Sequence, residues 1–162
     1  MALSLEQAKA IWRYDPETGH FFWLVSPSRK IVIGNRAGHQ IDGRWRLYFD
    51  GKGYKAGRVA WLFMTGEWPS SEIDHINRQP LDNRFVNLRP ATRLENSRNT
   101  SRAVGVLGVK GVVQIANSDR YFSRIRIGRK KRLHLGCFDT IEEAKAAYDA
   151  AVIKYHGEFA AT

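Results

Sequence analysis

Residues 72–99 read E-I-D-H-I-N-R-Q-P-L-D-N-R-F-V-N-L-R-P-A-T-R-L-E-N-S-R-N, and the fold of the chain is predicted from this stretch outward. Its polar side chains follow a pattern too specific for an ordinary surface. A short apolar strand ends on the pair Asp74 and His75, and a turn-rich segment follows. A second strand-like piece spans residues 85–88 and contains Asn87. The expected order is therefore strand, loop and strand, followed by a helix.

The helix is predicted by Thr92 and by Glu95 three residues later, which form a capping box ahead of Asn96. The carboxylate of Asp74 and the amide oxygen of Asn96 are hard oxygen ligands, and these suit Mg²⁺. The ordinary pKa of histidine, near ~6.5, lets His75 accept a proton at cellular pH. The pattern predicts metal-assisted phosphodiester hydrolysis. A lone Asp–His pair is more often a structural hydrogen bond, so the inference rests on the whole constellation.

Asp74, His75, Asn87 and Asn96 resemble the ββα-metal motif of HNH endonucleases, in the HNN form of many phage and intron-encoded homing endonucleases. The surrounding D-H-I-N…D-N-R…N-L-R-P-A-T…E-N…N is similar to that family over nearly the whole stretch. The resemblance implies that His75 is the general base and that Asp74 and Asn96 hold one divalent metal, Mg²⁺ with Mn²⁺ as the alternative. Asn87 would brace the loop that carries His75, and the resemblance places it with His75 among the catalytic residues. With one metal and one base, a monomer would nick DNA, and a double-strand break would need a homodimer or a second event.

One position departs from the family pattern. Relatives usually read Y-x-A-H-R-x-A-W, whereas residues 54–61 read Y-K-A-G-R-V-A-W, so Gly57 stands where a histidine is expected. A second hypothesis is therefore a DNA-binding protein on an HNH scaffold with impaired catalysis. The intact Asp-His-Asn-Asn set argues against it. A third hypothesis is a structure-selective or RNA-directed nuclease with the same chemistry.

Composition favours a nucleic-acid partner. The 162 residues carry a net charge of +10, which favours a polyanion such as double-stranded DNA. The single cysteine, Cys137, excludes a disulfide framework and a Cys-rich zinc site, and its apolar neighbours predict a small packed residue. The sequence contains no run of 18 apolar residues, so it predicts no membrane span. The first residues do not resemble a secretory signal. The family resemblance implies the cytoplasm of a cell that hosts a phage or mobile element.

Ahead of the motif, the sequence predicts a helix over 5–13, a strand over 20–25 and a helix over 58–64. Residues 44–49 alternate arginine or tyrosine with apolar side chains, which predicts a half-buried strand, and Asp50 with Gly51 predicts a hairpin turn to a strand over 53–55. Either solvent or phosphate could face the arginines of this strand, and the sequence leaves both alternatives open.

The C-terminal third predicts three antiparallel strands over 111–115, 120–127 and 132–136. A helix capped by Thr140 and Glu143 follows, with one clean apolar face. The fold class is therefore α+β, a ββα-metal core followed by a three-stranded antiparallel sheet and one helix.

This tail resembles the AP2 DNA-binding domain in G-V-K-G-V and in L-G-C-F-D-T-I-E-E-A-K-A-A-Y-D-A-A. The resemblance implies that residues on the sheet bind DNA. The base preference of the family cannot be transferred to this chain, because Val113 stands where plant relatives often have arginine. The alternative for these positions is a charged solvent face. The candidates are Lys110, Gln114, Arg124, Arg126, Arg132 and His134.

Together these features predict an HNH endonuclease domain over 1–100 with its motif at 72–99, a linker over 101–107 and an AP2-like DNA-binding domain over 108–162. The predicted function is metal-dependent, strand-nicking DNA hydrolysis of the homing type.

Overall fold

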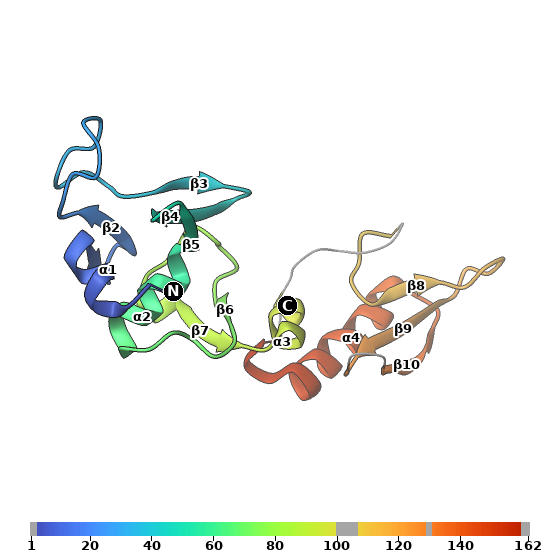
Figure 1. Ribbon diagram of the computed structural model, residues 1–162. Helices are drawn as coiled ribbons and strands as arrows, with labels where there is room; N and C mark the ends of the chain where they lie inside the picture. The colour runs from blue at the N-terminus through green and yellow to red at the C-terminus, as the bar shows by residue number, and fades with distance from the viewer. Residues whose placement is uncertain (1–2, 100–106, 129–130, 160–162) are drawn as a thin grey trace. The chain divides into compact units, whose positions relative to one another are not determined.

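The computed structural model describes residues 3–99, 107–128 and 131–159. The chain divides into two compact units, Met1–Ala91 and Thr92–Thr162. Every strand pairing among the described residues is antiparallel, and the helices alternate with small sheets along the chain (Figure 1). The predicted α+β class is confirmed.

The first unit begins with α1 (Leu5–Ile11), whose N-terminus is closed by the expected Ser4 capping box. The predicted helix over 5–13 is two residues too long, because β1 (Trp12–Asp15) already pairs with β2 (His20–Trp23) from its first residue. Trp12 is completely buried in this pairing. Trp12 lies at helical spacing in the sequence but belongs to the strand. Long-range packing therefore decides whether this residue continues the helix or starts the strand.

Three sequential strands form the next sheet, in the order β3 (His39–Ile41), β4 (Arg44–Phe49) and β5 (Lys52–Lys55). β3 is a strand that the sequence did not predict. The turn residues Asp50 and Gly51 have φ angles of 49° and 70°, which is the hairpin conformation their types favour. Buried Leu47 points from β4 into the core formed with α2 (Ala56–Thr65). Alternate residues such as Arg46 point to the opposite face.

The first unit ends in a hairpin of β6 (Glu72–His75) and β7 (Leu88–Ala91). The predicted strand over 85–88 is wrong over most of its length, since Phe85–Asn87 forms the 3-10 helix η1. Val86 points out of the core and is 80% exposed, and Asn87 N donates to Arg84 O at 3.0 Å. A tight turn therefore precedes β7.

The second unit opens with α3 (Arg93–Arg98), and the predicted capping box of Thr92 and Glu95 is confirmed with both reciprocal hydrogen bonds. Most of the predicted linker over 101–107 lies outside the described residues. The following sheet has the order β10 (Arg132–Phe138), β9 (Tyr121–Arg126) and β8 (Val112–Gln114).

The helix α4 (Ile141–His156) covers one face of this sheet (Figure 1). It is followed by the 3-10 turn η2 (Gly157–Phe159). Ile125 of β9 packs in a small core with Tyr148 and Val152 of α4. The predicted three-stranded sheet backed by one helix is confirmed. Among the described residues, no helix combines the length and apolarity needed to cross a bilayer.

The prediction that Cys137 is a packed residue is wrong, because its side chain is exposed. The pairing of β10 with β9 shifts between His134 and Gly136, which is a β-bulge at one extra residue. The bulge places Cys137 opposite Phe122, on the face of the sheet away from α4.

Candidate active site and nucleic-acid interface

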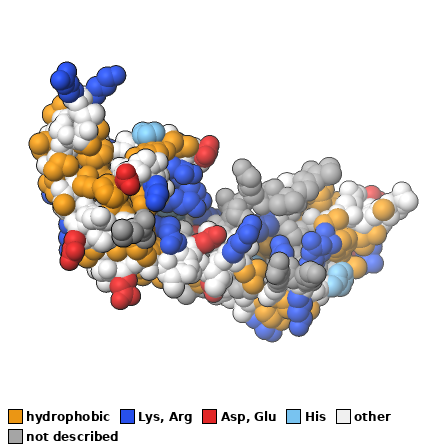
Figure 2. Space-filling view, viewed as in Figure 1, with side chains coloured by type: hydrophobic (Ala, Val, Ile, Leu, Met, Phe, Trp, Pro, Cys, Tyr) orange, Lys and Arg blue, Asp and Glu red, His pale blue; other side chains and the backbone are white. Residues whose placement is uncertain are grey.

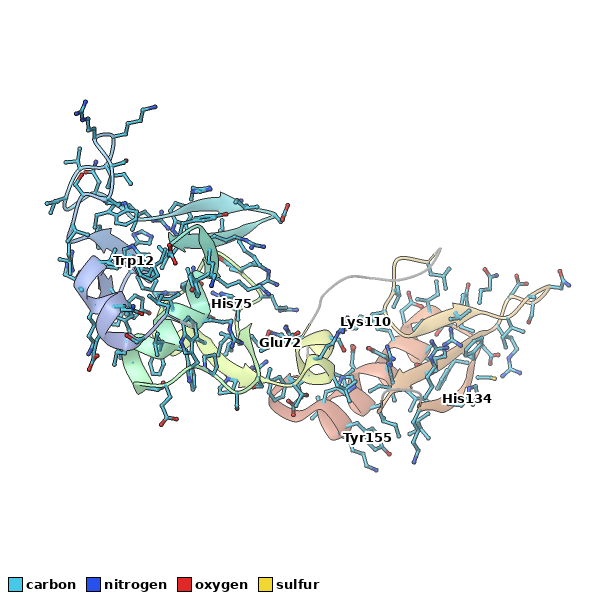
Figure 3. The ribbon with its side chains drawn as sticks, in the orientation of Figure 1. Trp12, Glu72, His75, Lys110, His134 and Tyr155 are labelled. Carbon is cyan, nitrogen blue, oxygen red and sulfur yellow. The ribbon has the colours of Figure 1, made fainter. Side chains whose placement is uncertain are left out.

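His75 ends β6, and it is buried against the loop that follows (Figure 3). Its Nε2 lies 3.2 Å from Oδ1 of Asn83. Asn83 Nδ2 donates to Leu81 O at 3.2 Å, which fixes Oδ1 as the acceptor. In the tautomer in which Nε2 donates to Asn83 Oδ1, Nδ1 is the proton-accepting atom of the neutral ring.

Asn83 is itself held by the N-terminal hairpin. The hydroxyl of Tyr14 on β1 donates to the carbonyl of Asn83 at 2.7 Å, and burial raises the pKa of Tyr14, so the donor stays protonated. Gly19 has a φ of 71°, and a Cβ there would lie 2.4 Å from Arg84 N, so only glycine permits this close approach. Sequence reasoning missed both Tyr14 and Asn83 as supports of the site. The D-N-R triplet was visible, but nothing local indicates which residue Asn83 contacts.

The electrostatics of the site favour neutral His75. Burial lowers the pKa of His75, the hydrogen bond that His75 makes to Asn83 opposes this shift, and the nearby positive charge of Arg44 adds to it. The imidazole is therefore uncharged and able to accept a proton near pH 7.

Asp74 precedes His75, which is the last residue of β6. Asp74 is 4% exposed and lies opposite Arg89 of β7. Arg89 Nε and Nη2 lie 2.9 Å and 2.8 Å from Asp74 Oδ2. The buried carboxylate thus has a compensating cation, and both of these contacts use the same oxygen.

Asn87 holds the loop between β6 and β7 closed. Its Oδ1 accepts from Asn77 N at 2.9 Å, and its Nδ2 donates to Asn77 Oδ1 at 3.0 Å and to Asp82 O at 2.8 Å. This is the geometry of a residue that braces the loop following His75. Its contribution to catalysis stays a prediction.

The predicted metal ligands belong to different units, since Asp74 lies on β6 and Asn96 on α3. Their joint ligation of a metal stays a prediction. Within the ranges that the structure describes, no group of three or more histidine, cysteine, aspartate or glutamate residues forms a metal cage. The donor set is that of a hydrated hard cation, which needs one or two protein oxygens.

Gly57, the departure from the family pattern, is buried in the first turn of α2. A Cβ at this position would lie 3.1 Å from Asn83 Oδ1, the atom that contacts His75. The position where relatives carry histidine is therefore adjacent to the residue that orients the proposed base.

The predicted DNA-binding residues divide between the faces of the second unit's sheet. Arg124 lies directly opposite His134, and Arg126 opposite Arg132, so these four exposed side chains share the face away from α4. Figure 3 shows His134 on the edge strand β10. The Arg124 guanidinium lies 5.5 Å from the centroid of the Phe122 ring. This face is basic and aromatic.

The two other candidates lie elsewhere. Gln114 is opposite Tyr121, which lies on the helix side of β9, and its Nε2 donates to Ser118 O at 3.2 Å in the hairpin turn. Lys110 is half-buried in the turn before β8. The structure does not bring Gln114 together with the arginines.

Two curated relatives come from Arabidopsis thaliana. The AP2-like ethylene-responsive transcription factor ANT is 31% identical over 137 residues, and the ethylene-responsive transcription factor WRI1 is 35% identical over 102 residues. The alignments cover 78% and 62% of this chain but 24% and 22% of the two relatives, so the chain spans about a quarter of their length. Residues 54–98 match the model of a family described as HNH endonuclease. The chain is similar to HNH endonucleases over residues 54–98 and to AP2-like transcription factors over a longer stretch. The resemblance to both families is confirmed.

The HNH segment takes in α2, the β6–β7 hairpin and α3, and so includes Gly57, His75 and Asn83. The AP2-like similarity to ANT is longer than residues 108–162, where the sequence predicted it. It therefore extends outside the predicted AP2-like segment.

Proposed function

We propose that this HNH protein is a metal-dependent DNA endonuclease in which His75 is the general base. The observation that carries the proposal is the buried, neutral His75 whose Nε2 is held at 3.2 Å by Asn83. A general base must be oriented and deprotonated at the working pH, and this ring meets both requirements. The match of residues 54–98 to HNH endonucleases supports the reaction class.

Asp74 and Asn96 would hold the divalent metal, Mg²⁺ with Mn²⁺ as the alternative. The fit is supported by the oxygen chemistry of Asp74, a buried carboxylate whose negative charge Arg89 compensates. When bound, such a metal supplies stabilisation of negative charge on the scissile phosphate and leaving oxygen.

The chain's own residues orient the base and move the proton. Nδ1 of His75 takes a proton from the attacking water, and the ring then carries a positive charge. Asn83 keeps Nε2 fixed while this happens, and Tyr14 keeps Asn83 in place. Asn87 holds the loop that follows His75 in one conformation.

The partner in this proposal is double-stranded DNA. The arginine-bearing face of β9 and β10 supports it, as does the net charge of +10. A sheet face of this kind can enter the major groove and reach base edges and phosphates. Both relatives are transcription factors by name, and this supports DNA as the ligand of the AP2-like segment. We further propose a monomer that nicks, or a homodimer that cuts both strands, in a homing-type role in the cytoplasm of a host cell.

The test is conversion of supercoiled plasmid to relaxed circles with Mg²⁺ or with EDTA. His75→Ala should lower the nicking rate by about 10²–10⁴-fold, the range for loss of a general base. His20→Ala, a histidine on β2, is the matched control and should cut like the natural protein. Equal nicking by His75→Ala and the natural protein would remove His75 from the mechanism.

The second candidate function is a DNA-binding protein with impaired catalysis, and Gly57 favours it. In this case the natural protein binds DNA but leaves plasmid supercoiled. Gly57→His would then produce metal-dependent nicking, while Gly57→Ala, which adds only the Cβ near Asn83, would not. Nicking by the natural protein would contradict this candidate.

A further inference from the structure

The chain between β2 and β3 forms an ordered loop over residues 24–38. At its base, Trp23 N donates to Asn35 O at 3.0 Å. Nearer its tip, the Ser26 hydroxyl lies 2.6 Å from the carbonyl of Ile31. These internal hydrogen bonds hold a defined shape without regular secondary structure.

This ordered loop presents apolar and cationic side chains to solvent. Val32 and Ile33 are each 60% exposed. Figure 2 shows Lys and Arg side chains at the tip of the loop and hydrophobic side chains below them. The cations of the loop are Arg29, Lys30 and Arg36. Single exposed apolar residues are common, but adjacent ones on an ordered loop beside cations indicate a contact surface.

A pocket of about 500 Å³ lies between this loop and the strands β3 and β4. Its size is within the range of small-molecule sites. Its wall includes the side chains of Trp23, Lys30, Arg36, His39 and Tyr48.

Aromatic rings form the strand side of the pocket. His39 and Tyr48 stack with centroids 5.1 Å apart and an interplanar angle of 3°. Tyr48 is 38% exposed and His39 is exposed, so solvent and a ligand can reach the edge of the stacked pair. Nucleobases stack on such rings whatever their sequence, because every base has a π-face.

The charge of the pocket also fits a nucleotide. Lys30 and Arg36 line it, and among the residues that the structure describes no aspartate or glutamate does. Arg36 is additionally fixed by its guanidinium, which lies 3.7 Å from the centroid of the Trp45 ring. Cations beside stacked rings are the combination that binds a base together with its phosphate.

We propose that this pocket receives one nucleobase extruded from bound DNA, and that Val32 and Ile33 open the base stack beside it. The inference rests on the proposed function for its DNA partner. Apolar side chains of this kind unstack base steps when they insert between them. A base that leaves the stack needs an aromatic site to enter.

The test uses two short DNA hairpins in EDTA, one fully paired and one with a single extrahelical adenine. The unstacking cost is already absent in the second hairpin, so the protein should bind it roughly tenfold more tightly than the paired one. Replacing the extrahelical adenine with 2-aminopurine gives a second readout, because stacking on Tyr48 quenches its fluorescence.

Tyr48→Ala should abolish both the tenfold preference and the quenching while keeping affinity for the paired hairpin. Tyr48→Phe should retain both, which separates the ring from the hydroxyl. Tyr155→Ala is the matched control, since Tyr155 on α4 is 37% exposed, nearly as much as Tyr48. Lys30→Ala, at the exposed loop tip, should reduce the preference without affecting folding.

Equal affinity for the two hairpins would overturn the proposal that the pocket receives a nucleobase. A preference for the extrahelical adenine that survives in Tyr48→Ala would do the same. Failure to bind either hairpin would overturn it together with the DNA-binding proposal. The readout is independent of catalysis, because His75→Ala should keep the preference in full. Loss of nicking therefore does not imply loss of the pocket.

Discussion

The chain twice builds three sequential antiparallel strands followed by one helix, and the two versions differ in what the helix contacts. α2 follows β3–β5, and α4 follows β8–β10. α2 packs against β4 on one side and against β6 and η1 on another. α4 packs on the strands of its own sheet and on the short η2 turn.

The two helices also differ in which of their residues are buried. α2 buries adjacent pairs of residues, Ala56 with Gly57 and Val59 with Ala60, so most of its circumference is covered. The buried residues of α4 follow the i, i+4, i+7, i+8, i+12 pattern of a single stripe: Ala144, Tyr148, Ala151, Val152 and His156. A helix enclosed on several sides can support a polar site such as that of His75. A helix covered on one side supports a sheet whose other face is left for a ligand.

Leu62→Ala in the enclosed helix should have the largest effect on stability. Leu62 is almost completely buried, so its truncation should lower the free energy of unfolding by about 3 kcal/mol. Ile153→Ala on α4, where the side chain is 67% exposed, should cost less than about 0.5 kcal/mol. Chemical denaturation measures both values, and similar losses would contradict the difference between the helices.

Asn83→Ala should impair the site supported by α2 while leaving the AP2-like sheet intact. Because His75 loses the contact that orients it, nicking should fall by about 10²-fold. Affinity for DNA in EDTA should stay unchanged. Gln79→Ala, an exposed change in the same loop, serves as control in the plasmid assay. Nicking at the natural rate would show that Asn83 does not position the base.

Arg124→Ala should weaken DNA binding by about tenfold and make its salt dependence shallower by about one unit of slope. Arg120→Ala is the control, because its Nε contacts Asp139 at 2.7 Å. Fluorescence anisotropy at several salt concentrations gives both quantities. An unchanged salt dependence of DNA binding in Arg124→Ala would remove the C-terminal sheet face from the interface. Arg46→Ala on β4 would show in the same assay whether the N-terminal sheet also contacts phosphate.

Asp82→Asn should have the smallest effect, and it should depend on pH. Hydrogen bonds from Arg84 hold the pKa of Asp82 at about 2, below its ordinary value of 3.8. Because the folded pKa is the lower one, the stabilisation is present above pH ~4 and is lost as pH falls towards 2. The variant should be less stable by about 1 kcal/mol at pH 7, and the difference should shrink as pH falls below ~4 and vanish only below pH ~2.

Urea denaturation at pH 7, 4 and 2.5 measures this difference. Asp139→Asn removes the ion pair in the C-terminal unit, where the aspartate side chain is 79% exposed, and should change stability little at any pH. A constant deficit of Asp82→Asn across this range would contradict the ionic origin of the effect.

Local chemistry made much of this fold predictable. The starts of α1, α3 and α4 follow from the N-cap residues Ser4, Thr92 and Thr140. Each of these side chains accepts a hydrogen bond from the backbone of the residue three positions later. The stripe of α4 and the alternation of β4 are equally local, because each element repeats with a fixed period. The motif residues were also recognisable, since their types and spacing carry the resemblance to the HNH family.

Tertiary structure alone decided how the site is supported. Tyr14 and Asn83 are 69 positions apart, and no local rule pairs them. Trp12 joins a strand and Cys137 turns outward because of strand pairing and a bulge, which depend on distant partners. The sequence by itself determined most of the elements and the reactive groups, because hydrogen bonds and periodicity act over a few residues. The orientation of His75 depended on the packed chain, because its supports come from segments that only folding brings together.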